Sequence, residues 1–208
     1  MKRYFFLFTV LCFSLVTFAQ EFNYGVTAGL NVSHPKDYRN HVGFNVGVKG
    51  EYTFSDKQDC LYLESALLLT SKGWKTDVYA DESENAGTAD WTCDAYYLEL
   101  PLMVGYKSGI TDRVRISASA GPYVACGLFG KSKVKDIPAA DDIDNIFSDG
   151  MYKRFDYGVK LYVGVDYSNW QLGVSYGLSL QNPIKGGWAL QDPKDRTFSL
   201  QLAYIINR

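Results

Sequence analysis

Residues 96–107, YYLELPLMVGYK, alternate two kinds of side chain along their whole length. One set of alternate positions is apolar throughout, whereas the other set includes Glu99, Gly105 and Lys107. Because successive side chains of a β-strand point to opposite faces, this pattern predicts a strand with one apolar face. A tilted strand of this length, at about 3.3 Å per residue, covers the roughly 25 Å apolar band of an outer-membrane barrel. Pro101 lacks an N–H, which predicts a bulge or a locally widened pairing at that position.

Seven further segments alternate in the same way. They predict seven more strands, at residues 22–32, 42–54, 61–72, 113–128, 155–167, 170–181 and 197–206. The connections are long after the first, third, fifth and seventh strands and short after the second, fourth and sixth. Long external loops and short periplasmic turns are typical of outer-membrane barrels. The sequence therefore predicts an all-β fold, an eight-stranded antiparallel up-and-down transmembrane β-barrel with both termini in the periplasm.

The alternation alone does not say which face points outward, so a soluble, lipocalin-like ligand-binding barrel is an alternative. The polar face, however, is rich in Gly, Ser and Asn, which fit the narrow interior of an eight-stranded barrel. The apolar face carries Leu and Val in mid-strand and aromatic residues near the strand ends, as a lipid-facing belt does. We therefore predict that the protein lies in the cell outer membrane, with outer-membrane lipid around its apolar face.

The chain opens with two basic residues, an apolar run and Ala19. This order predicts a signal peptide, residues 1–19, that is cleaved from the mature chain. The apolar run is shorter than the ~20 residues that a membrane-spanning helix needs. Residues 20–208 are then expected to form one outer-membrane β-barrel domain.

Charge and cysteine content narrow the function further. Without the signal peptide, 19 Lys and Arg (21 − 2) stand against 23 Asp and Glu, a net charge of −4. This balance predicts no nucleic-acid partner. The three remaining cysteines, Cys60, Cys93 and Cys126, are odd in number and widely spaced, which predicts free thiols and neither a disulfide framework nor a zinc site. We expect no metal and no cofactor.

The polar faces of the predicted strands carry charged side chains that would point into the barrel. Buried charges persist only when they are paired and hydrogen-bonded, and the side chains of an eight-stranded barrel can fill its interior. We therefore predict no diffusion pore but a structural network of interior ion pairs formed by Lys49, Glu64, Glu99, Arg115 and Lys160. Across the short turn at residues 55–59, paired positions should sum to 113 or 115, which brings Lys49 within reach of Glu64.

Two features raise the question of catalysis. Residues 173–177, GVSYG, match the G-x-S-x-G nucleophile elbow, but that elbow needs a strained strand-to-helix turn and these residues lie inside a predicted strand. His34 and His41 both fall in the predicted first external loop, so an outer-membrane lipid-modifying enzyme with an active site at the rim is an alternative. No serine or carboxylate is tied to either histidine by its spacing. We therefore predict a non-enzymatic protein without catalytic residues.

The predicted third external loop is strongly charged. Its acidic run lacks the glycine and the terminal glutamate of a calcium loop, which predicts a solvated acidic segment. Three lysines, Lys131, Lys133 and Lys135, precede this run. They could contact lipopolysaccharide phosphates or could balance the acids that follow, and the sequence leaves both interpretations open.

Four segments of the chain resemble the PorT-type outer-membrane β-barrel proteins of Bacteroidetes. They are residues 61–74 (LYLESALLLTSKGW), 97–107 (YLELPLMVGYK), 120–128 (AGPYVACGL) and 155–167 (FDYGVKLYVGVDY). Their order and spacing cover essentially the whole mature chain. The resemblance implies a small outer-membrane barrel and, for the namesake member, a part in protein secretion through the outer membrane. Residues 205–208, IINR, depart from the pattern because they lack the terminal aromatic residue common in barrel-assembly signals.

These observations predict a non-enzymatic outer-membrane component of binding, assembly or secretion. Such a protein would act through its external loops or its periplasmic rim, with partners among the proteins of the cell envelope.

Overall fold

The computed structural model describes most of the chain from Phe22 onward. The described residues are 22–34, 39–55, 58–79, 88–134, 145–148, 152–182 and 195–207. For residues 77–79, 88–90 and 134 the description covers the backbone alone. The predicted signal peptide, residues 1–19, lies outside the described residues, as do Lys135 and most of the acidic run that follows it.

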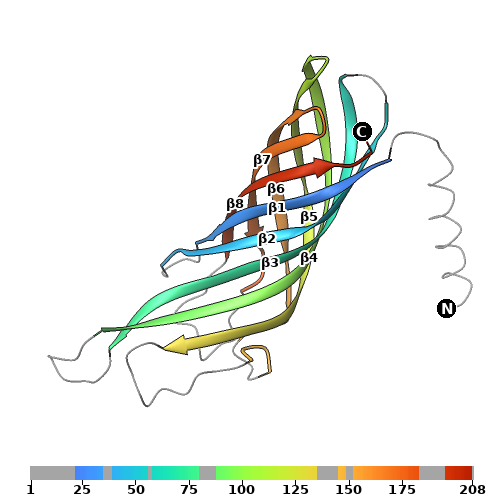
Figure 1. Cartoon of the computed structure of the whole chain (residues 1–208). Coiled ribbons are helices and arrows are strands. Elements are labelled where there is room, and N and C mark those ends of the chain that lie inside the picture. Colours follow the sequence, from blue (N-terminus) through green and yellow to red (C-terminus); the bar gives the residue numbers. More distant parts are fainter. Residues whose placement is uncertain are drawn as a thin grey trace, which may run out of the picture.

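Eight antiparallel strands form a closed barrel in which each strand pairs with the next and the last pairs with the first (Figure 1). Among the described residues no helix has the length and apolar character needed to cross a membrane. The predicted eight-stranded up-and-down barrel is thus confirmed. Its strands are β1 (Phe22–Ser33), β2 (His41–Thr53), β3 (Cys60–Tyr79), β4 (Thr88–Thr111), β5 (Val114–Val134), β6 (Phe155–Tyr167), β7 (Trp170–Ser179) and β8 (Arg196–Ile205).

The two ends of the barrel differ in their connections. Short connections join β2 to β3, β4 to β5 and β6 to β7 at one end, which we call the turn end. The start of β1 and the end of β8 lie at this end too, where Asn207 Nδ2 donates a hydrogen bond to the carbonyl of Phe22 at 2.7 Å (Figure 1). The longer connections lie at the opposite, loop end. Because the short turns of outer-membrane barrels lie in the periplasm, we expect the turn end there and the loop end outside.

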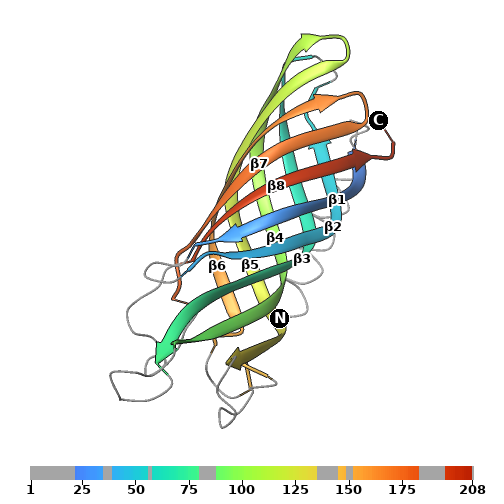
Figure 2. The same cartoon turned by 60° about the vertical axis from the view of Figure 1, so that its left-hand side comes forward.

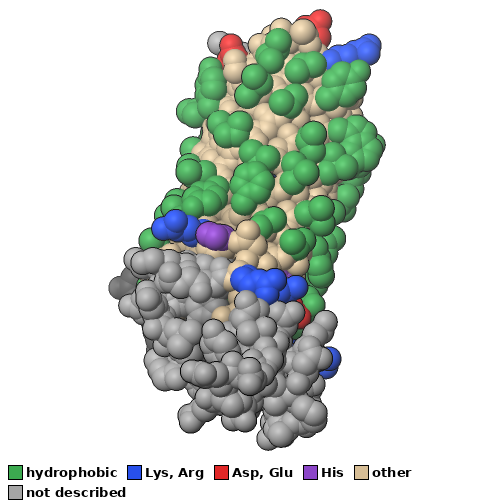
Figure 3. All heavy atoms as spheres, turned by 90° about the vertical axis from the view of Figure 1, so that its left-hand side faces the viewer, with side chains coloured by type: hydrophobic (Ala, Val, Ile, Leu, Met, Phe, Trp, Pro, Cys, Tyr) green, Lys and Arg blue, Asp and Glu red, His purple; other side chains and the backbone are tan. Residues whose placement is uncertain are grey.

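Apolar side chains cover the outside of the barrel, and polar side chains fill its inside. Along β6, for example, Leu161 and Val163 are 47% and 53% exposed, whereas Lys160 and Asp166 are 8% and 1% exposed. Figure 3 shows the resulting apolar band between the two ends. The predicted orientation of the faces is correct, and the lipocalin-like alternative is wrong because it would place the apolar face inside.

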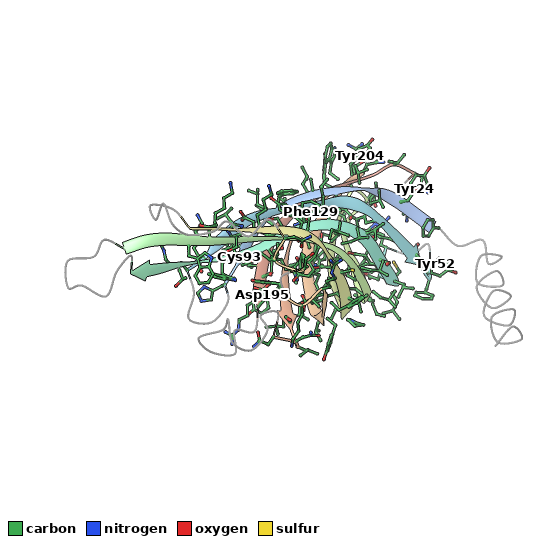
Figure 4. All side chains as sticks on the ribbon, turned by 90° about the horizontal axis from the view of Figure 1, so that it is seen from below. Tyr24, Tyr52, Cys93, Phe129, Asp195 and Tyr204 are labelled. Atoms are coloured by element: carbon green, nitrogen blue, oxygen red, sulfur yellow. The ribbon has the colours of Figure 1, made fainter. Side chains whose placement is uncertain are left out.

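Aromatic residues mark both edges of the apolar band. Tyr24, Tyr52 and Tyr204 lie on the outside of the barrel near the turn end (Figure 4). Near the loop end, the ring of Phe129 stacks on that of Tyr96 with the ring centroids 4.7 Å apart. Amphipathic aromatic rings concentrate at the level of lipid headgroups, so these two sets delimit the hydrocarbon-facing part of the surface.

Three strands run past the others at the loop end (Figures 1 and 2). β3, β4 and β5 have 20, 24 and 21 residues, against 10 to 13 in the remaining strands. The sequence pattern predicted shorter strands here, because residues beyond the lipid need no apolar face and their alternation fades. Pairing of β3 with β4 continues from Gly73↔Asp94 to Tyr79↔Thr88. Packing of Trp74 against Trp91, with ring centroids 5.1 Å apart, supports this extension.

Strand pairing near Pro101 is interrupted without a change of register. Ser65 pairs with Leu102 and Leu68 pairs with Glu99, but residues 66–67 of β3 and residues 100–101 of β4 do not pair with each other. The Ser65 hydroxyl donates to the carbonyl of Pro101 at 2.9 Å. The predicted disturbance is therefore a gap in the ladder and not a bulge.

A lipid-facing charge tests the assignment of the apolar band. We expect Leu161→Lys, at the middle of β6, to lower the free energy of unfolding by about 2–4 kcal/mol because the ammonium would lie near the bilayer midplane. In Phe155→Lys, at the end of the same strand, the added charge should lower the free energy of unfolding by only about 1 kcal/mol. Equilibrium refolding in lipid vesicles measures both values, and Leu161→Ala and Phe155→Ala correct for the lost side chains. Equal charge costs at the two positions would contradict the assigned membrane depth.

Candidate functional site

The inward faces of the strands bring charged side chains together in two clusters inside the barrel. One lies toward the turn end and the other toward the loop end. The turn-end cluster consists of Lys49, Glu51, Glu64, Lys107, Asp166 and Gln171. The loop-end cluster consists of Lys72, Glu99, Tyr123, Asp156, Lys160 and Ser179.

Two ammonium groups organise the turn-end cluster. Lys107 Nζ lies 2.5 Å from Glu51 Oε2 and 3.1 Å from Asp166 Oδ2. Lys49 Nζ lies 3.2 Å from Glu51 Oε1 and 3.4 Å from Glu64 Oε2. The contact with Glu64 is an ion pair without a hydrogen bond, since Glu64 Oε2 is buried and has no hydrogen-bond partner. Glu51 therefore bridges the two lysines.

The amide of Gln171 completes the turn-end cluster. It accepts a hydrogen bond from Lys49 at 2.8 Å and donates to Glu51 at 2.9 Å. The ammonium of Lys107 also lies 4.8 Å from the centroid of the Tyr62 ring. Each lysine thus has several partners, as burial of a charge requires.

The loop-end cluster combines two lysines with two carboxylates. Lys160 Nζ pairs with Glu99 Oε1, and Lys72 Nζ lies 3.5 Å from Glu99 Oε2 and 2.9 Å from Asp156 Oδ2. Asp156 also accepts hydrogen bonds from the hydroxyls of Tyr123 at 3.1 Å and Ser179 at 2.5 Å. These four charges sum to zero, and their short contacts leave no room for a ligand between them.

The structure distributes the five predicted network residues over different places. Lys49 and Glu64 lie together because Lys49 is opposite Ala66, a register sum of 115, which puts Glu64 on the diagonal. Glu99 and Lys160 meet in the loop-end cluster. Arg115 is half-buried at the edge of the turn-end cluster, opposite Asp166 in the β5–β6 register. It also lines a hollow of about 190 Å³ at the turn end.

Five charged members of the two clusters were not among the five predicted network residues. They are Glu51, Lys72, Lys107, Asp156 and Asp166. All five occupy polar-face positions in the predicted alternation. Applying the face assignment to every charged residue would have found them, whereas the choice of partners depends on register across long loops.

Between the clusters the interior is filled. Two interior cavities lined by described residues have volumes of only about 10 and 20 Å³, room for one water molecule at most in each. The Tyr162 ring crosses the lumen over Gly173, where a Cβ atom would lie 2.5 Å from the ring. This contact explains a glycine of the GVSYG segment, which is an unbroken part of β7 with Ser175 buried. The segment is therefore not a nucleophile elbow.

Apolar side chains fill the interior at the loop end. Ile146 and Phe147, from the connection between β5 and β6, pack with Tyr152 against Trp74 and Tyr97. The Phe147 ring meets that of Tyr97 edge-on, with centroids 5.5 Å apart. This apolar cluster lies closer to the loop end than the loop-end charges do. The described residues therefore show no continuous aqueous path through the barrel.

At the loop-end rim, His41 contacts the carboxylate of Asp94, a pair that sequence spacing did not predict. His41 begins β2, and its Nε2 lies 3.1 Å from Asp94 Oδ1 of β4. Ser33 is opposite His41 in the β1–β2 register. However, Ser33 Oγ and His41 Nδ1 are both buried without a hydrogen-bond partner, so they are not bonded to each other. His34 instead contacts the side chain of Asn40.

The described residues contain no group of three or more His, Cys, Asp or Glu side chains arranged to hold a metal ion. Cys60, Cys93 and Cys126 are free thiols, as predicted.

The closed barrel, its apolar outer band and its polar interior define a small outer-membrane β-barrel protein. The family of outer membrane protein beta-barrel domains matches residues 18–185, and the chain belongs to this family. The protein accordingly lies in the outer membrane. Curated proteins offer no match to the chain.

Several solved structures are similar to this chain. Ail, the attachment invasion locus protein of Yersinia pestis, is 17% identical over 90% of this chain and 99% of its own, with a TM-score of 0.43. Neisserial surface protein A is 13% identical over 89% of this chain and 97% of its own, with a TM-score of 0.46. The outer membrane enzyme PagL is 12% identical over 86% of this chain and 99% of its own, with a TM-score of 0.44.

The pair formed by Lys49 and Glu64 is open to a double-mutant cycle. We expect Lys49→Met to lower the free energy of unfolding by about 3–5 kcal/mol, because it leaves buried carboxylates without their cation. Adding Glu64→Gln should recover part of that loss, giving a coupling energy of about 1–3 kcal/mol. Refolding in detergent micelles measures each variant.

Asp156 of the loop-end cluster supplies the matched control. Its side chain bonds to Lys72 and to no member of the turn-end cluster in the described structure. Lys49→Met and Asp156→Asn should therefore be additive within about 0.5 kcal/mol. Additive losses for Lys49→Met and Glu64→Gln as well would show that the pair is not coupled.

Proposed function

We propose that this barrel is a non-enzymatic binding or assembly component of PorT type, and that its partner-binding surface is the loop-end extension of β3, β4 and β5. The observation that carries the proposal is the filled interior: the ion-pair clusters serve structure, and the described residues leave no channel or ligand cavity between them. Partner binding would then take place at the ends of the barrel. The extension is the largest described structure beyond the apolar band.

The extension has the features of a binding surface. Backbone pairing and the Trp74–Trp91 contact hold its strands in place, so a partner would meet a preformed surface. Preformed surfaces bind with a smaller loss of conformational entropy than disordered segments. We propose that residues 1–19 direct export and that the partner is a protein of the cell envelope, in keeping with the resemblance to secretion-associated barrels.

A second candidate function rests on the contact between His41 and Asp94. A histidine held by a carboxylate at the membrane rim is an arrangement that acyl-ester hydrolases use. No hydroxyl in the described structure is hydrogen-bonded to the His41 ring, and Ser33 is 1% exposed. The non-enzymatic role therefore fits the geometry better.

The proposal is tested by shortening the extension. Replacing residues 78–89 by Asn-Gly keeps the Asp77↔Asp90 pair and closes it with a two-residue hairpin turn. We expect this variant to insert into the outer membrane. In intact cells it should form at least about tenfold fewer cross-links to envelope proteins than the full barrel does, which corresponds to about 1.4 kcal/mol of binding free energy. Cross-linking followed by mass spectrometry of the affinity-tagged barrel provides the measurement.

The control places Asn-Gly at Ser168 and Asn169, the turn between β6 and β7 at the opposite end. Ser168 has a positive φ of 50°, which asparagine tolerates. This variant should keep its cross-links. Unchanged cross-links in the shortened variant would refute the binding surface. Hydrolysis of outer-leaflet lipid that is lost in His41→Ala would favour the enzyme instead.

A further inference from the structure

A hollow of about 190 Å³ opens at the turn end of the barrel. It lies between the β4–β5 turn and the β6–β7 turn, and we call it the turn-end hollow. Its lining residues are Asp112, Arg113, Arg115, Ser168 and Asn169. Figure 3 shows both basic and acidic side chains at this end, the upper end in that view. A cavity of about 150 Å³ holds a benzene molecule, so the hollow has room for a ligand group of that size.

Two guanidinium groups line the turn-end hollow without an ion pair or a side-chain hydrogen bond to any described residue. Arg113 is exposed in the β4–β5 turn, and Arg115 is half-buried near the start of β5. Each guanidinium presents five N–H donors in a planar fork. A half-buried fork without acceptors has lost hydration and gained no partner in return, which points to a ligand that supplies the acceptors.

The carboxylates of the neighbouring turns are hydrogen-bonded to neutral donors. Asp59 accepts hydrogen bonds from the hydroxyl of Ser108 at 2.8 Å and from the N–H of Gly109 at 3.1 Å. Asp112 accepts a hydrogen bond from the amide of Gln58 at 3.0 Å. These bonds hold the β2–β3 turn against the β4–β5 turn. They leave the two arginines facing the hollow.

The carboxylate beneath the hollow is also taken up by other groups. Asp166 is opposite Arg115 in the β5–β6 register, yet its oxygens lie 3.1 Å from the ammonium of Lys107 and 3.2 Å from the hydroxyl of Ser117. It also accepts a hydrogen bond from the amide of Gln171 at 3.3 Å. The two turns that form the hollow, residues 108–115 and 166–171, are described in full. Their own acidic groups therefore do not serve as partners of the arginines.

Hydrogen bonds fix the wall of the hollow that the β6–β7 turn forms. Ser168 has a left-handed φ of 50°, and its N–H donates to the carbonyl of Arg113 at 3.0 Å. The side chain of Asn169 donates to the carbonyl of Ile205 at 2.7 Å, and the N–H of Ile205 donates to the carbonyl of Asn169 at 2.8 Å. A preformed hollow binds its ligand with a smaller loss of conformational entropy.

The chemistry of the lining favours a carboxylate as the ligand group. A guanidinium fork binds the two oxygens of a planar carboxylate side by side. Phosphate also suits such forks, but Asp112 lines the same hollow and would repel a doubly charged group more strongly. The hollow is larger than a carboxylate alone, and a carboxylate such as Asp112 can accept a further hydrogen bond from an amide N–H. These features together fit the terminal residue of a peptide.

We propose that the turn-end hollow binds the terminal carboxylate of a short peptide through Arg113 and Arg115. The same carboxylate is carried by a peptide that is free in the periplasm and by a peptide that is part of the cell wall. The hollow lies at the opposite end of the barrel from the proposed protein-binding surface. This site therefore goes beyond the proposed function and does not depend on it.

Isothermal titration calorimetry of the refolded barrel in detergent micelles tests the proposal. The probe is acetyl-alanyl-alanine, and the comparison is the same dipeptide with a terminal amide in place of the carboxylate. We expect the acid to bind at least about tenfold more tightly, because hydrogen bonds between charged groups are about twice as strong as neutral ones. Arg115→Gln should weaken binding of the acid by about tenfold or more. Arg115→Lys should recover only part of this loss, because an ammonium lacks the planar fork.

Matched variants separate this site from a general effect of charge or folding. Arg196→Gln, which removes an exposed cation at the loop end, should leave the affinity unchanged. Arg113→Gln changes an exposed turn residue and should weaken binding even if Arg115→Gln does not fold. Equal affinity for the acid and the amide, or an unchanged affinity in Arg113→Gln and Arg115→Gln, would overturn the proposal. Displacement of the dipeptide by an equal concentration of inorganic phosphate would also overturn it, because the hollow would then be a site for a soluble anion.

Sedimentation with isolated cell-wall sacculi distinguishes the two sources of the peptide. Sedimentation of the barrel that the dipeptide acid abolishes would assign the site to the cell wall. Calorimetric binding without sedimentation would assign it to a free peptide. Both results support a carboxylate site, and they identify where its ligand comes from.

Discussion

Lipid around a β-sheet demands that every backbone polar group find its partner within the protein, and a closed barrel meets this demand. Closure with an apolar exterior then forces polar side chains into a narrow interior, where charges must neutralise one another. Here the demand is met by two clusters of lysines and carboxylates at separations of 3.5 Å or less. The proposed function follows from this inside-out arrangement, because a filled interior would leave binding to the ends of the barrel.

The loop end carries the strand-paired extension that we propose as the partner-binding surface. Beyond the lipid, β3 to β5 continue to pair, and Trp74 packs on Trp91 where no membrane supports the sheet. The aromatic row at Tyr96 and Phe129 separates the hydrocarbon-facing part from this extension. The same sheet thus passes through three surroundings: hydrocarbon, lipid headgroups and the external medium.

Side-chain alternation was enough to predict eight strands, both faces and the contact of Lys49 with Glu64, because lipid imposes one strict period on every membrane-crossing segment. The alternation did not predict the structure of the strand segments that extend beyond the lipid. The sequence pattern predicted a long polar connection from Gly73 to Trp91, whereas β3 continues to Tyr79 and β4 begins at Thr88, because both faces of these ends tolerate polar residues. The bulge at Leu128 interrupts the alternation, so the predicted strand ended there although β5 continues to Val134, and the contact of His41 with Asp94 joins strands that are distant in sequence. Register at long connections is set by such tertiary contacts.

The central claim is that the barrel interior is a closed, ion-paired polar core. Conductance across a planar lipid bilayer tests it most directly, because an open lumen would carry ions under an applied voltage. The account predicts that the refolded barrel adds no stepwise current to that of the protein-free bilayer. Reproducible single-channel steps from the folded, heat-modifiable form would contradict it.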